Sequence, residues 1–147
     1  MMDLLERSDE ELASEVGARL QDMIYGAGYA AMSREEQNVY LVYVLDAEVA
    51  NGGLEQFFGN SSGNCAVRTA VALEEIGLDA ASKVLRTALS VFPDAGPAED
   101  RSTRYDQLET LGARRNAWDG LGSHLEGIHT RTGSYIHAHA MAFGLPP

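Results

Sequence analysis

The sequence has one cysteine, few basic residues and no long apolar run. Cys65 cannot form an internal disulfide or a cysteine-built zinc site, and a single cysteine is typical of the reducing cytoplasm. The longest apolar run, Val39 to Leu45, is far shorter than the roughly 20 residues that a transmembrane helix requires. Asp3 and Glu6 stand where a signal peptide would carry basic residues. We therefore expect a cytoplasmic protein without a transmembrane helix.

The shortage of basic residues is concentrated in the first part of the chain. Up to Glu55 there are 12 acidic and 3 basic residues, a net charge of −9, whereas the remainder has 10 acidic and 8 basic residues, a net charge of −2. A surface of that sign repels nucleic acid and anionic membranes and favours basic partners. Composition alone favours a simpler interpretation, in which the negative charge keeps the protein in solution.

The size and the residue pattern indicate one helical domain. A chain of 147 residues with 45% apolar and 22% charged residues is long and apolar enough to close one hydrophobic core. It contains no fixed-period repeat, low-complexity tract or convincing alternation typical of strands. We predict an all-α, single-domain orthogonal bundle of about six to eight helices over residues 1–147.

Two capping boxes mark the first helices. Ser8 with Glu11 precedes an apolar row that ends at a glycine break, residues 26–28. Ser33 with Glu36 opens a helix that is apolar on every side, reaches about Val49 and is therefore expected at the centre of the bundle. Further helices are predicted over residues 66–76, over 80–92 with Asp79 as N-cap, around Leu108, from Trp118 through Leu121 to Ile128, and from Tyr135 to Phe143, with a loop over residues 93–100.

The first helix also carries a row of carboxylates beside its apolar row. We call this set the acidic row; it consists of Asp9, Glu10, Glu11, Glu15 and Asp22. Glu11, Glu15 and Asp22 fall on one stripe of the helix, and Asp9 and Glu10 lie at its start, so the acidic row is the predicted contact surface for a basic partner.

The densest cluster of unusual residues is the segment 48–63. Gly52 and Gly53 are expected to end the central helix, after which Leu54, Phe57 and Phe58 form a short amphipathic turn. The polar residues of the segment have two interpretations. They satisfy backbone groups freed at the helix breaks, or they line a polar pocket in which Glu48 acts as a general base. These residues are Glu48, Asn51, Gln56 and Asn60.

The structural interpretation of that segment is favoured because no nucleophile, base or metal-ligand set accompanies Glu48. The four histidines do not change this, because His124 and His129 are five residues apart and His137 and His139 two, so neither pair shares a helix side. We expect no catalytic residue, no metal site and no cofactor.

The segment 48–63 resembles the hallmark of the DNA-mimic protein family. That hallmark runs Glu-Val-Asn-Asn-Gly-Gly, an aromatic, any residue, Gln-Phe-Phe, any residue, Asn-Ser-Ser-Gly, and Ala50 and Leu54 depart from it. The upstream tyrosine-rich helix and the helix ending at Gly77 also look like the family, whereas about the last forty residues match only loosely. The matching residues are Glu48, Val49, Asn51, Gly52, Gly53, Gln56, Phe57, Phe58, Asn60, Ser61, Ser62 and Gly63.

The resemblance implies an all-α fold, a homodimer and, for the family's named member, an acidic face that imitates DNA phosphates on a transcription factor. The acidic row and the N-terminal charge favour the same function independently. We therefore expect a non-enzymatic module that binds a basic, DNA-binding protein and contacts neither nucleic acid nor membrane directly. The alternatives are a small enzyme or ligand-binding domain that uses Glu48, and an immunity-like partner of a basic toxin.

Overall fold

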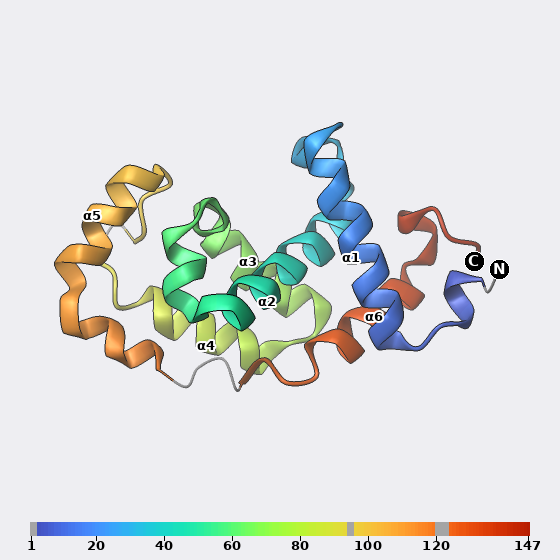
Figure 1. Ribbon diagram of the computed structural model, residues 1–147. Coiled ribbons are helices and arrows are strands. Elements are labelled where there is room, and N and C mark those ends of the chain that lie inside the picture. The colour runs from blue at the N-terminus through green and yellow to red at the C-terminus, as the bar shows by residue number, and fades with distance from the viewer. Residues whose placement is uncertain (1–2, 94–95, 120–123) are drawn as a thin grey trace.

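The computed structural model describes residues 3–93, 96–119 and 124–147, and within these ranges the regular elements are all helical (Figure 1). The predicted all-α bundle is therefore confirmed. Its α-helices are α1 (Asp9–Tyr25), α2 (Arg34–Gly59), α3 (Ala66–Ile76), α4 (Asp79–Leu89), α5 (Arg101–Leu111) and α6 (Ile128–Ala138). Short 3-10 helices precede or connect them: η1 (Leu4–Glu6), η2 (Tyr29–Ala31), η3 (Ser61–Cys65), η4 (Gly112–Trp118) and η6 (Ala140–Phe143).

The helix α2 lies at the centre of the molecule and packs against α3, while α4 packs against α3 (Figure 1). The helices α1 and α6 pack against each other at one end, and α5 with η4 forms the other end. None of the helices in the described ranges is long and apolar enough to cross a membrane.

Both predicted capping boxes are present. The Ser8 hydroxyl accepts from the Glu11 backbone N–H, and the Glu11 carboxylate accepts from the Ser8 backbone N–H. Ser33 and Glu36 exchange the same pair of hydrogen bonds at the start of α2. These bonds satisfy donors that a helix start leaves unpaired, which is why the two starts could be predicted to the residue.

The predicted end of the central helix at Gly52 and Gly53 is confirmed, because both glycines have non-helical backbone angles and α2 consists of two helical limbs joined at this kink, the second of which ends at Gly59. Gly53 has φ 70° and ψ −169°, a backbone region that only glycine occupies readily. The second limb then places Leu54, Phe57 and Phe58 in the core, as expected from their spacing.

The core at the α5 end is built on aromatic rings. The Phe58 ring lies 4.8 Å from the Trp118 ring and 5.1 Å from the Phe92 ring, measured between centroids. Offset and edge contacts of this kind add to the burial of apolar surface. The Trp118 indole N–H donates to the Ala88 carbonyl across 3.2 Å, so the one polar atom of that ring is satisfied.

Two of the predicted helices require correction. Asp79 is the first residue of α4, whose N-cap is Leu78, and α4 ends at Leu89. The described residues do not form the predicted helix from Trp118 to Ile128, because Trp118 ends η4, Asp119 is extended and Ile128 begins α6. Leu121 lies outside the described residues. The glycines at 112 and 127 have positive φ, which interrupts a regular helix on both sides of this stretch.

Candidate functional site

The segment 48–63 is organised around the Glu48 carboxylate. Its Oε2 atom accepts from Gln56 Nε2 across 2.7 Å and from Asn60 Nδ2 across 2.9 Å. Glu48 lies before the bend of α2, and the two amides lie after it. Hydrogen bonds to a carboxylate are stronger than neutral ones, and these two connect the limbs of α2 across the bend.

The polar residues predicted to share one pocket are only partly brought together. Asn51 is exposed at the bend and makes no side-chain hydrogen bond within the described residues. Gln56 and Asn60 line an open groove against α5, whereas Glu48 lines a hollow on the other side of α2. The Glu48 carboxylate is therefore held between two surfaces, and the four residues form no common cavity.

We call the cavity on that side the Glu48 hollow. It has a volume of about 310 Å³ and lies between α1, α2 and η3. Tyr25 and Tyr40 contribute aromatic rings to it, and Ser61 and Ser62 contribute hydroxyl groups. Burial raises the pKa of the Tyr40 phenol, which therefore stays protonated at neutral pH.

The end of the segment 48–63 is held by a buried arginine that the sequence analysis missed. The Arg104 side chain is fully buried, and its guanidinium donates to the carbonyls of Phe58 at 2.6 Å and Asn60 at 2.7 Å. It also donates to the carbonyls of Ala98 at 2.7 Å and Glu99 at 3.1 Å. Burial lowers the pKa of Arg104 from its ordinary value, but an arginine stays charged in proteins. A charged group thus links α2, η3 and the 96–100 loop.

A second buried polar group lies at the other end of α2. Asn38 is fully buried, and its amide donates to Glu75 Oε2 at 2.6 Å and to the Tyr135 hydroxyl at 3.2 Å. Its Oδ1 accepts from Arg68 Nη2 at 2.7 Å. Hydrogen bonding from the Arg34 guanidinium holds the pKa of Glu75 below its ordinary value. The group joins α2, α3 and α6 through fully satisfied amide atoms.

The sequence carried a signal for each of these missed residues. Arg104 stands four residues before Leu108 and seven before Leu111, so it occupies a position where the helical period calls for an apolar residue. Asn38 stands in the same relation to Leu41 and Leu45, at three and seven residues. A polar residue on an apolar helix face is the pattern expected of a buried hydrogen-bonding group.

The acidic row lies along α1, where most of its carboxylates contact neighbouring residues. Asp9 accepts from the Ser134 hydroxyl at 2.9 Å and lies 3.4 Å from His137 Nε2, while Glu10 accepts from Thr130 Oγ1 at 3.3 Å. These contacts tie the start of α1 to α6. Glu11 belongs to the capping box and Glu15 pairs with Arg7.

Asp22 and the outer sides of Glu10 and Glu11 are exposed on this face. The three basic side chains of the first 55 residues are all engaged within the molecule. Arg7 contacts Glu15, Arg34 contacts Glu75, and Arg19 donates to the Phe143 carbonyl at 2.7 Å. Two of these three positive charges are thus paired with carboxylates, and acidic residues remain in large excess over this part of the chain.

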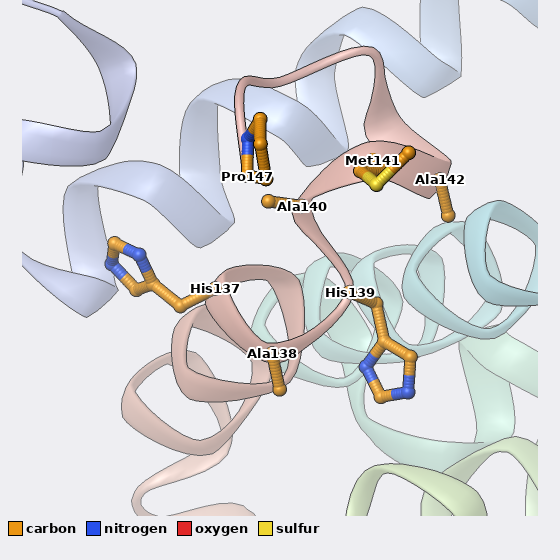
Figure 2. Close-up of a pocket in the computed structure, with 7 residues that line it drawn as sticks. All are labelled: His137, Ala138, His139, Ala140, Met141, Ala142 and Pro147. Atoms are coloured by element: carbon orange, nitrogen blue, oxygen red, sulfur yellow. The ribbon is translucent and has the colours of Figure 1, made fainter.

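The C-terminal histidines surround a shallow hollow of about 450 Å³ (Figure 2). His137 points toward α1, where Asp9 lies, whereas His139 points the other way and its Nδ1 lies 2.9 Å from the Tyr135 carbonyl (Figure 2). His129 makes a separate contact, 2.8 Å from Asp46. In the ranges that the structure describes, no three His, Cys, Asp or Glu side chains lie close enough together to hold a metal ion.

The family model described as DMP19-like protein matches residues 30–139. No curated protein and no solved structure matches the chain.

This finding corrects the resemblance drawn from the sequence, which took the segment 48–63 as the mark of a DNA-mimic family. The match does not single out that segment. It extends from η2 through α6, including the C-terminal part that we expected to match only loosely. Because the model spans well over half of the sequence, the assignment depends on that whole span, and the chain belongs to the DMP19-like protein family.

Proposed function

We propose that this protein is a non-enzymatic acidic module that binds the basic surface of a DNA-binding protein in the place of DNA. The observation that carries the proposal is the charge of the first 55 residues, 12 acidic against 3 basic, together with the internal contacts of all three bases. Membership in the DMP19-like family, a family of DNA mimics, supports the same function.

The contact surface in this proposal is the acidic row. Exposed charges of one sign attract a surface of the opposite sign and raise the rate of association. They contribute to binding only while salt does not screen them, and screening shortens their range from about 10 Å at 0.1 M salt to about 3 Å at 1 M. Capture of the partner should therefore weaken as salt rises. By the same family membership we propose a homodimer, which sedimentation equilibrium tests directly.

A pull-down with a neutralised variant tests the proposal. The variant Glu10→Gln, Glu11→Gln, Asp22→Asn removes three exposed charges of the acidic row, and glutamine can replace glutamate in a capping box. The matched control, Asp106→Asn, Glu109→Gln, Asp119→Asn, removes three exposed charges from α5 and the residue after η4. We expect the first variant to lose the basic partner and the control to keep it.

Competition with duplex DNA separates mimicry from other acidic recognition. Excess DNA should release a partner that is held through its DNA-binding surface. A basic toxin without nucleic-acid affinity would stay bound, which would indicate the immunity-like alternative. Equal capture by both triple variants would rule out the acidic row as the contact surface.

A further inference from the structure

The Glu48 hollow has an unusual balance of charge. Glu48 is the one residue of its lining that carries a formal charge, and that charge is negative. Burial raises the pKa values of Tyr40 and Cys65, so both stay neutral at neutral pH. Two arginines lie close enough to act on Cys65, but Arg68 is tied to Asn38 and lines a different hollow, and Arg104 is tied to backbone carbonyls.

The lining offers acceptors at Glu48, Ser62 and Thr69, beside the Gln21 amide and the hydroxyls of Ser61, Tyr25 and Tyr40. Gln56 and Asn60 both donate to Glu48 Oε2, and no described side chain donates to Oε1. The Ser62 hydroxyl donates to the Phe57 carbonyl at 3.0 Å, and the Thr69 hydroxyl donates to the Cys65 carbonyl at 2.8 Å. With their hydrogens so engaged, the two hydroxyl oxygens keep lone pairs that can accept hydrogen bonds from an occupant.

The remaining lining is aromatic and aliphatic. Tyr25 is 83% exposed, an unusual state for a large aromatic side chain at the end of a helix, and it lines the hollow together with Tyr40. Leu41, Val44 and Phe57 supply apolar surface. An aromatic face attracts a cation, and it stacks well on a planar guanidinium.

We propose that the Glu48 hollow binds an alkylguanidinium group. Glu48 neutralises the charge of this group, Tyr25 and Tyr40 stack against its planar face, and the aliphatic side chains of the lining contact its alkyl stem. A guanidinium has five N–H donors and no acceptor, which complements the Glu48 carboxylate and the Ser62 and Thr69 oxygens. The volume of about 310 Å³ is at the lower end of the range for small-molecule sites. This inference does not depend on the proposed function, since a free alkylguanidinium would occupy the hollow without any protein partner.

Nuclear magnetic resonance can test the site with n-butylguanidinium as the probe. The side-chain amides of Gln56 and Asn60 report on the carboxylate, because both donate to Glu48. We expect their signals to shift and saturate with a Kd on the order of millimolar, as for other very small ligands. Neutral n-butylurea, with nearly the same shape, should leave them unchanged.

Two variants and one control locate the binding. Glu48→Gln should weaken binding by roughly tenfold or more, because it removes a charged acceptor. Tyr25→Ala removes an exposed ring that lies outside the hydrogen-bonded group around Glu48, and it should weaken binding roughly two- to fivefold. Tyr105→Ala is the matched control, since Tyr105 is also exposed, at 59%, but lines the groove beside α5.

The outcomes separate the sources of the group and can overturn the site. A blocked Ala-Arg-Ala tripeptide that shifts the same amides identifies a protein side chain as the occupant, whereas binding of free n-butylguanidinium alone identifies a small molecule. Either result supports the site. Equal binding of n-butylurea, no saturable shift, or binding unchanged in both the Glu48→Gln and Tyr25→Ala variants would overturn it.

Discussion

Arg104 Nε lies 2.6 Å from the carbonyl oxygen of Phe58 and donates a hydrogen bond to it in the interior of the protein. Because no carboxylate accepts from this guanidinium within the described residues, its partners are backbone carbonyls at the end of α2 and in the 96–100 loop. The loop thereby becomes part of the folded core.

Replacing Arg104 should destabilise the protein strongly. The methionine of Arg104→Met is an unbranched side chain, but it leaves four carbonyls without their donor. Each unsatisfied buried group costs about 1–3 kcal/mol. We expect the free energy of unfolding, measured by urea denaturation, to fall by at least about 3 kcal/mol. The control Arg114→Met changes an exposed side chain and should change it by less than about 0.5 kcal/mol.

The Glu48 carboxylate and the Gln56 amide should be energetically coupled. A double-mutant cycle with Glu48→Ala and Gln56→Ala measures the interaction across the bend of α2. We expect a coupling of about 1–3 kcal/mol in urea denaturation, because the acceptor is a carboxylate. Additive effects would mean that the bend is set by Gly53 and the buried aromatic rings instead.

Gly133 allows the close approach of α1 and α6. A Cβ atom at this position would lie 2.1 Å from the Asp9 carbonyl oxygen, which belongs to rigid backbone. Gly133→Ala should therefore lower the free energy of unfolding by about 1–3 kcal/mol, through displacement of the two helices. Gly59→Ala is the control, because a Cβ there meets nothing within 4 Å, and the melting temperature of this variant should not fall.

Stability should fall on acidification, in part through Glu75. Hydrogen bonds from Arg34 and Asn38 lower the folded-state pKa of Glu75 below its ordinary value of 4.5. The stabilisation is present above that ordinary value and is lost as the pH falls through the folded-state pKa. The free energy of unfolding, measured with urea at pH 7 and at about pH 3, should differ less between the two pH values for Glu75→Gln than for the wild type.

The variant Glu109→Gln removes an exposed carboxyl from α5 and isolates the effect of net charge. If the Glu75→Gln protein lost as much stability between the two pH values as the wild type does, Glu75 would not contribute to the acid sensitivity.

The elements that could be predicted from the sequence depend on neighbouring residues. Ser8 with Glu11 and Ser33 with Glu36 form hydrogen bonds three positions apart, so the sequence itself contains both partners. The backbone conformation at the Gly53 bend could not be predicted from neighbouring residues alone, because glycine permits several conformations. Contacts across the bend and in the core, Glu48 with Asn60 and Phe58 with Trp118, select one of them.

The candidate site was predictable only in part, for the same physical reason. The importance of Glu48 was evident, but its hollow is completed by Tyr25 from α1, at the far end of a different helix. Arg104 reaches its carbonyls across 46 positions of sequence. Contacts of that kind depend on packing, which helical periodicity does not specify. The sequence indicates them only where a polar residue interrupts an apolar face.

The pairing of α1 with α6 has a consequence for how the chain is made. Asp9 and Ser134, which join the two helices, are 125 positions apart in the sequence. During synthesis α1 therefore leaves the ribosome long before α6 has been made. Until then the buried row of α1, which includes Leu12, Val16 and Leu20, has no α6 to pack against. Closing so long a loop is slow. We therefore expect the nascent chain to expose apolar surface of α1 until its last helix is complete.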